Sequence, residues 1–223
     1  MNDQWVTVAR VREDYEVQAY VHKADQNLKE LGYTDHGTRH CDIVAAVARD
    51  ILLHLGKSER VAELAGVAGY LHDIGNSVAR EDHGIVASLL ARHVLNRLGM
   101  PIGEIVEVMC AIGNHEEEYG QPVSDVAAAL ILADKSDVHY SRVRTVDPVD
   151  YDIHDRVNAA CTQSSVAVDL VAQVITLALI IDSSVAPVME YFEIFLTRMV
   201  MCRKAAAHLG CAFRLIINDV VIA

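Results

Sequence analysis

The segment GYLHDIGN at residues 69–76 places an imidazole and a carboxylate side by side, His72 and Asp73, in an otherwise apolar stretch. An isolated polar group costs free energy when it is buried, so such groups are normally paired or bound to a metal. We therefore expect His72 and Asp73 to contact polar residues from elsewhere in the chain. Four further residues are expected to point into the interior, and they are His40, His83, His115 and Asp134.

Together these six residues supply four imidazoles and two carboxylates, which are ligand types for Zn²⁺, Mn²⁺ and iron. A single four-coordinate ion cannot use all six donors, whereas two ions bridged by one carboxylate can. A hydrogen-bonded network of histidines and aspartates without metal is the other common use of such a set. The residue types alone leave both interpretations open.

The elements that position these residues are predicted from apolar periodicity. Apolar residues recur at helical spacing in five segments, at residues 43–55, 61–71, 86–98, 102–112 and 126–137. Gly56, Gly75 and Gly99 follow as stop signals, and Ser124 is suited to cap the last of these helices. His40, His72, His115 and Asp134 fall on the apolar faces of the predicted helices, whereas a loop before the third helix is expected to aim His83 inward.

The last third of the chain changes character. Alternating apolar residues at 166–170 and 175–181 predict two strands, and residues 186–210 predict a long amphipathic helix closed by a glycine. An Asn-Asp turn separates two further short strands at the C-terminal end. We therefore predict a mainly α fold, with a helical domain at 1–158 and a small α+β unit of ββαββ type at 159–223.

Composition limits the class of protein. With 223 residues and 52% hydrophobic content, the chain is long enough for one substantial core, and its net charge of −12 argues against nonspecific binding to nucleic acid. Its five cysteines form no C-x-x-C pair and are expected to be reduced. We find neither a signal-peptide pattern nor an apolar run long enough for a bilayer, so we expect a cytoplasmic protein without a membrane partner.

The polar pattern resembles the HD-domain superfamily of metal-dependent phosphohydrolases over about residues 15–145. GTRHCDIVAAVARDIL matches the segment of the first histidine, AGYLHDIGN the His-Asp doublet, and LADKSD the closing aspartate. DHGIVASLL and AIGNHEEEYG look like the two additional histidine segments of the six-ligand, dinuclear subgroup. The resemblance implies a helical HD fold and a hydrolase that contains metal.

Carried over by position, the resemblance implies that one metal is held by His40, His72, Asp73 and Asp134. Asp73 bridges to a second metal, which His83 and His115 also hold. Iron and manganese are the expected ions, and zinc, cobalt, nickel and magnesium are further candidates. Activity is expected to be cleavage of a phosphoester or pyrophosphate bond by metal-activated hydroxide, in a nucleotide or another small phosphorylated metabolite.

Two differences from the cyclic-di-GMP phosphodiesterases narrow the choice of HD subgroup. Cyclic-di-GMP phosphodiesterases carry a His-His pair and a Gly-Tyr-Pro triplet, whereas here Asn114 precedes His115 and GQP stands at residues 120–122. The pattern is closer to small bacterial HD enzymes that hydrolyse diadenosine polyphosphates. Six such ligands also occur in HD-fold di-iron oxygenases, which is one alternative. A module that senses a metal or nucleotide without catalysis is the other.

Cations near the expected ligands are candidates for binding phosphate oxygens. We assign Asp73 and Lys135 to catalysis and Arg80, Arg39 and Arg144 to substrate binding.

Further histidines and carboxylates are candidates for lesser roles. Asp137 is expected to support a ligand, Glu116 to orient water, and His36 to be a possible extra contact, while His93 is interpreted as a core or boundary residue. The C-terminal unit, with its sheet edge and Met-rich helix, is a candidate homodimer interface.

Overall fold

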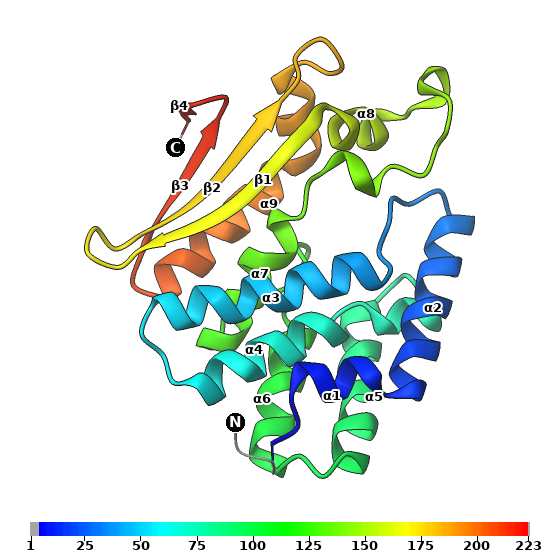
Figure 1. Ribbon diagram of the computed structural model, residues 1–223, viewed down its shortest axis with the longest axis vertical. Helices are drawn as coiled ribbons and strands as arrows, with labels where there is room; N and C mark the ends of the chain where they lie inside the picture. Colours follow the sequence, from blue (N-terminus) through cyan, green and yellow to red (C-terminus); the bar gives the residue numbers. More distant parts are fainter. Residues whose placement is uncertain (1–4, 223) are drawn as a thin grey trace.

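The computed structural model describes residues 5–222 and confirms a mainly helical fold that ends in a small mixed sheet (Figure 1). The predictions about a signal peptide and about the first and last residues of the two domains concern chain ends that lie partly outside these residues. The α-helices are α1 (Val8–Glu13), α2 (Tyr15–Glu30), α3 (Thr38–His54), α4 (Glu59–Leu71), α5 (His83–Arg97), α6 (Ile102–Gly113), α7 (Asp125–Ser136), α8 (Ile153–Ala160) and α9 (Val188–His208). Short 3-10 helices are η1 (Ile74–Ser77), η2 (Tyr140–Arg142) and η3 (Pro148–Asp150).

The five predicted helices correspond to α3–α7, and the predicted local signals are present at their ends except for Gly75, which lies inside η1 after α4 has ended at Leu71. Ser124 caps α7 by accepting the Ala127 N–H at 3.2 Å. Gly56 and Gly99 follow α3 and α5 with φ of +74° and +84°, the left-handed region that glycine adopts without a steric penalty. Helices α3, α4, α6 and α7 pack against one another and hold the helical core.

Some predicted helix faces are wrong. Leu89, Ile102 and Val106, which we expected in apolar stripes, are 58%, 64% and 55% exposed. His93, interpreted as a core or boundary residue, has a side chain 67% exposed and lies 3.6 Å from Glu16. The buried face of α5 contains Gly84, Ala87, Ser88, Ala91, Val94 and Leu95 instead, so Leu89 and His93 face outward.

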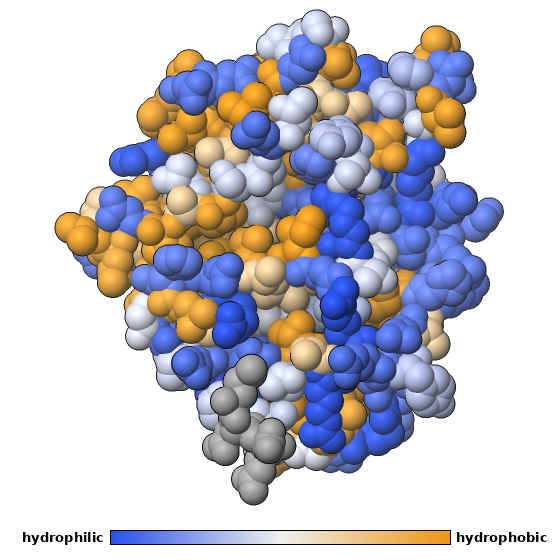
Figure 2. Space-filling view, in the orientation of Figure 1, coloured by the Kyte–Doolittle hydropathy of each residue, from blue (hydrophilic) through white to orange (hydrophobic). Residues whose placement is uncertain are grey.

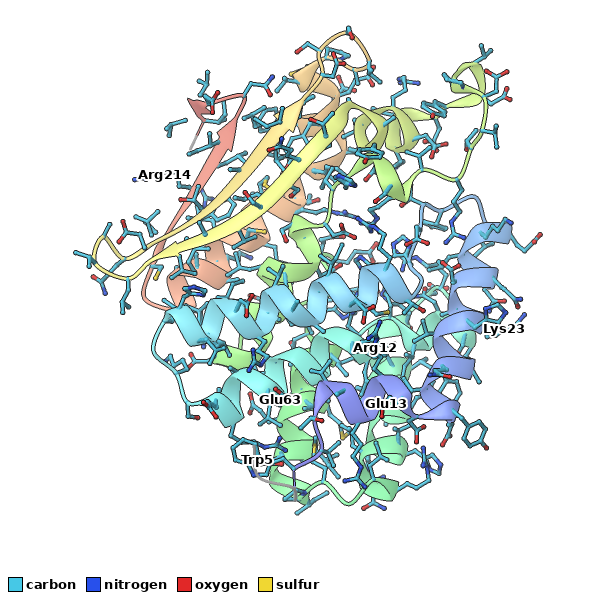
Figure 3. The ribbon with its side chains drawn as sticks, in the orientation of Figure 1. Trp5, Arg12, Glu13, Lys23, Glu63 and Arg214 are labelled. Atoms are coloured by element: carbon cyan, nitrogen blue, oxygen red, sulfur yellow. The ribbon has the colours of Figure 1, made fainter. Side chains whose placement is uncertain are left out.

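The N-terminal helix is fastened to the helical body by one carboxylate. Glu63 of α4 accepts the Val8 N–H through Oε1 at 2.7 Å and the Arg49 Nε–H through Oε2 at 3.1 Å (Figure 3). Val8 is the first residue of α1, so the carboxylate lies at the positive end of that helix's dipole.

The sheet contains β1 (Cys161–Asp169), β2 (Val174–Ile181), β3 (Ala212–Ile217) and β4 (Val220–Val221), in that spatial order. Strands β1 and β2 are antiparallel, β2 and β3 parallel, and β3 and β4 antiparallel. Parallel strands need a crossover connection, which α9 supplies. The predicted ββαββ order of elements is therefore confirmed.

The sheet has one buried face and one open face. Ile175, Leu177, Leu179 and Ile181 of β2 are buried in the same apolar cluster as residues of α9. Side chains of the opposite face reach the surface, where hydrophobic residues gather over the strands while the α2 side is mostly hydrophilic (Figure 2). Between residues 5 and 222, none of the helices has the length and apolar character that a bilayer crossing requires.

The change from helices to strands lies at Ala160 and Cys161, where α8 ends and β1 begins. Helix α8 was not among the predicted elements, because its eight residues have little apolar periodicity. One apolar cluster of buried residues extends through both parts of the chain. The division into domains at residues 158 and 159 stays a prediction.

Candidate metal centre

The six predicted ligand residues converge from three helices, α3, α5 and α7, and from the segments that follow α4 and α6. His40 lies in the first turns of α3, His72 and Asp73 follow the last turn of α4, and His83 is the first residue of α5 rather than part of the preceding loop. His115 follows α6, and Asp134 lies near the end of α7. All are buried except Asp134, which is partly exposed.

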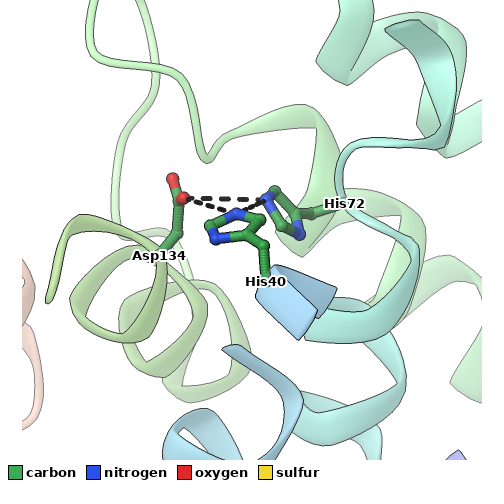
Figure 4. A group of neighbouring side chains, drawn as sticks. All are labelled: His40, His72 and Asp134. Carbon is green, nitrogen blue, oxygen red and sulfur yellow. Dashed lines mark hydrogen bonds and ion pairs between the residues drawn. The ribbon is translucent and has the colours of Figure 1, made fainter. Parts of the chain in front are cut away.

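One group of donor atoms comprises His40, His72 and Asp134 (Figure 4). His40 Nε2 lies 3.2 Å from His72 Nε2 and 3.5 Å from Asp134 Oδ1. His72 Nε2 lies 3.6 Å from the same oxygen of Asp134. The three donors therefore face a common point, as the ligands of one ion do.

The two oxygens of the Asp73 carboxylate face different groups of donor atoms. Its Oδ2 lies 3.3 Å from His72 Nε2 and 3.7 Å from His40 Nε2, whereas its Oδ1 lies 3.2 Å from His83 Nε2. His115 completes the far side, with its ring centroid 5.1 Å from those of both His72 and His83. A carboxylate with one oxygen toward each of two donor groups has the placement that a bridging ligand needs. His72 lies between the groups, since His72, Asp73 and His115 also form a candidate triplet.

Each imidazole is oriented by a contact on its Nδ1 side. His40 Nδ1 donates to Asp137 Oδ2 at 2.7 Å, and the Nδ1 atoms of His72 and His115 donate to the carbonyls of Gly69 and Ile112, each at 2.7 Å. These partners only accept hydrogen bonds, so Nδ1 carries a proton and Nε2 is the atom available to a metal. The predicted supporting role of Asp137 agrees with this geometry.

The fourth imidazole is held by a carboxylate and a carbonyl. His83 Nδ1 lies 3.1 Å from the Arg80 carbonyl and 3.4 Å from Glu116 Oε2. Glu116 Oε1 also accepts the Gly84 N–H at 2.8 Å, which fixes the carboxylate at the start of α5. Glu116 therefore orients a candidate ligand, in addition to its predicted role toward water.

The electrostatics of the cluster favour a cation. Burial opposes ionisation of both carboxyl groups, but His72 holds the pKa of Asp73, and Lys135 that of Asp134, well below the usual range. Burial also lowers the pKa of His72, yet the two carboxylates raise it to about 10. Burial and the charge on His72 lower the pKa of His115 to about 3. The protein groups thus prefer one positive charge between the carboxylates, and the donor set fits a metal ion there.

Two glycines of the GYLHDIGN segment allow its neighbours to approach. A Cβ on Gly69 would lie 2.9 Å from the backbone of Ala45, where α4 crosses α3. A Cβ on Gly75 would lie 2.0 Å from the His83 carbonyl oxygen. Since real Cβ atoms do not approach so closely, glycine at these positions lets α3 and α5 carry His40 and His83 to the doublet.

Two of the predicted functional cations border the cluster. Lys135 is buried, and its Nζ lies 2.6 Å from Asp134 Oδ2 and 3.1 Å from Glu117 Oε1. Arg80 donates to Asn76 Oδ1 at 3.3 Å and places its guanidinium 5.0 Å from the centroid of the Tyr33 ring. Both line the hollow beside the candidate ligands.

The other two predicted cations, Arg39 and Arg144, pair with carboxylates outside the hollow. Arg39 forms two hydrogen bonds to Asp137, at 3.1 and 3.0 Å, so it supports the carboxylate that orients His40. Arg144 pairs with Asp25 and donates to the Thr34 carbonyl at 3.3 Å. Neither belongs to the lining of the hollow beside the ligand cluster. His36, the possible extra contact, does belong to that lining.

Arg198 is a site residue that sequence reasoning missed. It comes from α9, lines the same hollow, and places its Nε 2.8 Å from Glu117 Oε1. Arg198 and Glu117 therefore form an ion pair but not a hydrogen bond, because no donor among the described residues is aligned with Glu117 Oε1. The only local signal was one charge among several in an amphipathic helix, and such helices ordinarily carry charges on their outer faces.

Comparison with known proteins supports the resemblance. Residues 38–138 match the HD domain family, a segment that contains all six candidate ligands and ends before the sheet. An uncharacterized protein from Methanocaldococcus jannaschii is 31% identical in an alignment 152 residues long, which covers 58% of this chain and 58% of the relative. The chain thus spans less than two thirds of the relative's length in this match. The match supports the HD-domain resemblance for residues 38–138.

Proposed function

We propose that this protein hydrolyses a phosphoester or pyrophosphate bond in a small phosphorylated metabolite, at a dinuclear centre of the six-ligand type. The observation that supports it most is the Asp73 carboxylate, whose two oxygens face the His40 and His72 side and the His83 side at 3.2–3.7 Å. The oriented imidazoles supply the remaining donors. Iron or manganese is the proposed ion, and nucleotides are the first substrates to test.

The chemistry of the site divides between metal and protein. Two bound cations supply a lowered pKa for an attacking water and offset charge on the phosphoryl oxygens. Asp73 and Asp134 stay ionised and hold the donors in place. Lys135 is buried, yet the carboxylates of Asp134 and Glu117 raise its pKa, so it remains a fixed positive charge rather than a base. We propose that Lys135 stabilises the negative charge of the scissile phosphate and that Arg80 binds another part of the substrate.

Phosphate release from purified full-length protein tests this function. The protein is purified without oxygen, its metals are quantified, and nucleotides, dinucleotide polyphosphates and sugar phosphates are screened with Mn²⁺, Fe²⁺, Co²⁺ and Zn²⁺. We expect phosphate release that requires metal and proceeds without oxygen. Turnover that requires oxygen would establish the oxygenase alternative instead. Tight nucleotide binding with no turnover under any metal would favour a sensing module.

The cytoplasmic location, the homodimer and the absence of nucleic-acid or membrane partners stay predictions. The size of the particle in solution, measured by light scattering at several protein concentrations, tests the homodimer.

A further inference from the structure

A larger cleft adjoins the candidate metal centre. The hollow at the ligands has a volume of about 80 Å³, and the neighbouring cleft about 280 Å³. His36, Arg80 and Arg198 line both spaces, so the hollow and the cleft border each other at these residues. The cleft is therefore the nearest space for the remainder of a molecule whose phosphate lies at the ligands, and its size is near the lower end for small-molecule sites.

Much of the cleft wall comes from outside the segment that matches the HD domain. Asp152 and two residues of α8, His154 and Asn158, contribute to it, and α9 contributes Phe195 and Arg198. The loop between α2 and α3 supplies other lining residues, among them Tyr33. The C-terminal part of the chain thus contributes to the space beside the metal centre, in addition to forming the sheet.

The charge of the cleft differs from that of the protein as a whole. The chain carries a net charge of −12, yet the cleft lining contains Arg80, Arg142 and Arg198 against one carboxylate, Asp152. Asp152 caps α8 by accepting the Asp155 N–H at 2.8 Å, which places its charge at a helix N-terminus. The local excess of guanidinium groups favours an anion in this cleft.

Two of these arginines have little carboxylate charge opposite their guanidinium groups. Arg198 pairs with Glu117 alone and shares that carboxylate with Lys135, which also pairs with Asp134. Arg80 pairs with no carboxylate among the described residues, and its guanidinium contacts the Asn76 amide oxygen and the His83 ring. Each guanidinium also lies against an aromatic ring, Arg198 at 4.5 Å from the Phe195 centroid, which limits its motion.

We propose that this cleft binds the part of the substrate beyond the scissile phosphate, and that Arg198, with Arg80, binds a second anionic group on it. The substrate class is then a small molecule with a scissile phosphate and a second phosphate or carboxylate within the reach of the cleft. Arg198 is a specificity-determining residue for this class. The inference rests on the proposed function for the placement of the scissile phosphate.

Equilibrium binding tests the cleft independently of turnover. Calorimetric titrations of the metal-loaded full chain compare a hexose monophosphate, the corresponding phosphogluconate with its added carboxylate, and the hexose bisphosphate. We expect the two doubly anionic compounds to bind more tightly. Arg198→Gln is expected to weaken their binding by about tenfold or more, the usual scale for a lost hydrogen bond to a charged group, and the monophosphate's by less. The two doubly anionic compounds distinguish a carboxylate from a phosphate as the preferred second group.

A matched control lies on the same helix. Arg203 is exposed on α9, so Arg203→Gln makes the same chemical change away from the cleft and should leave all three affinities unchanged. Equal binding of the three compounds, or equal loss for all three in Arg198→Gln, would overturn the inference. Binding that depends on Arg198 without phosphate release would instead refute the proposed function and leave the cleft intact. Thermal unfolding of each variant identifies loss of fold.

Discussion

The helical part of the molecule and its C-terminal sheet use their interiors in opposite ways. In the helical part, His40, His72 and Asp73 are at most 5% exposed and point toward one another. In the sheet, the buried positions of β2 are aliphatic, whereas Arg214 of β3 projects outward from the molecule (Figure 3). One interior concentrates ionisable groups and the other excludes them.

The difference shows which residues serve stability and which serve chemistry. Burying ionisable groups costs free energy that an apolar core of the same shape does not. The six converging polar residues are therefore best explained by a function, whereas the sheet residues are explained by packing. The two parts meet at the cleft, where Arg198 extends from the C-terminal unit toward the candidate metal centre.

Removal of the central carboxylate should produce the largest effect. We expect Asp73→Ala to abolish metal binding and reduce phosphate release to background, because both donor groups lose a shared oxygen ligand. Metal content measured by mass spectrometry on the purified variant checks this. His54→Ala is the control, since that exposed ring bonds only the Asp50 carbonyl of its own helix among the described residues. Full metal content in Asp73→Ala would refute the site as drawn.

A packing change in the sheet should leave the centre intact while lowering stability. Leu177 is 2% exposed, so Leu177→Ala should lower the free energy of unfolding by about 2–5 kcal/mol. Ile180→Ala, on the open face of the same strand and 36% exposed, should cost much less. Denaturant unfolding measures both losses, and metal content per folded chain should match the wild type. Metal loss in Leu177→Ala would show that the two interiors are not separate.

A smaller effect is expected at the edge of the centre. Asp137→Asn keeps the shape of the side chain but removes the charge that faces His40 and Arg39. We expect metal affinity or activity to fall by about 10–100-fold, as is usual when an outer partner of a histidine ligand is lost. Competition with a chelator measures the affinity, and Asp150→Asn at an exposed position is the control. Unchanged affinity would mean that Asp137 serves stability alone.

The sequence predicted most of the regular structure. Helices α3–α7 and the ββαββ order follow from periodicity and from local stop and cap signals, which are properties of neighbouring residues. The sides on which Leu89 and His93 lie were wrong because periodicity gives spacing, whereas the buried side depends on which helices pack against the segment. Helix α8 was missed because its short polar sequence has little periodicity of its own.

The candidate site was predictable to a similar extent. The doublet and the four further polar residues stood out because each interrupts an apolar pattern. Arg198 did not, since a charge on an amphipathic helix is ordinary and its position near the centre depends on how α9 packs on α7. The engagement of Arg144 with Asp25 is likewise a contact between residues far apart in the chain, which no local pattern encodes.

The convergence of ligands from α3, α5, α7 and the segments after α4 and α6 has a consequence for the lifetime of the folded chain. Donors this far apart in sequence meet only after the helices have packed, so an ion that binds all of them binds the native state alone. By mass action, free metal at about 100 times its dissociation constant then adds about 2.7 kcal/mol to the free energy of unfolding. For the proposed metalloenzyme, metal supply in the cell would control turnover of the protein as well as its catalysis.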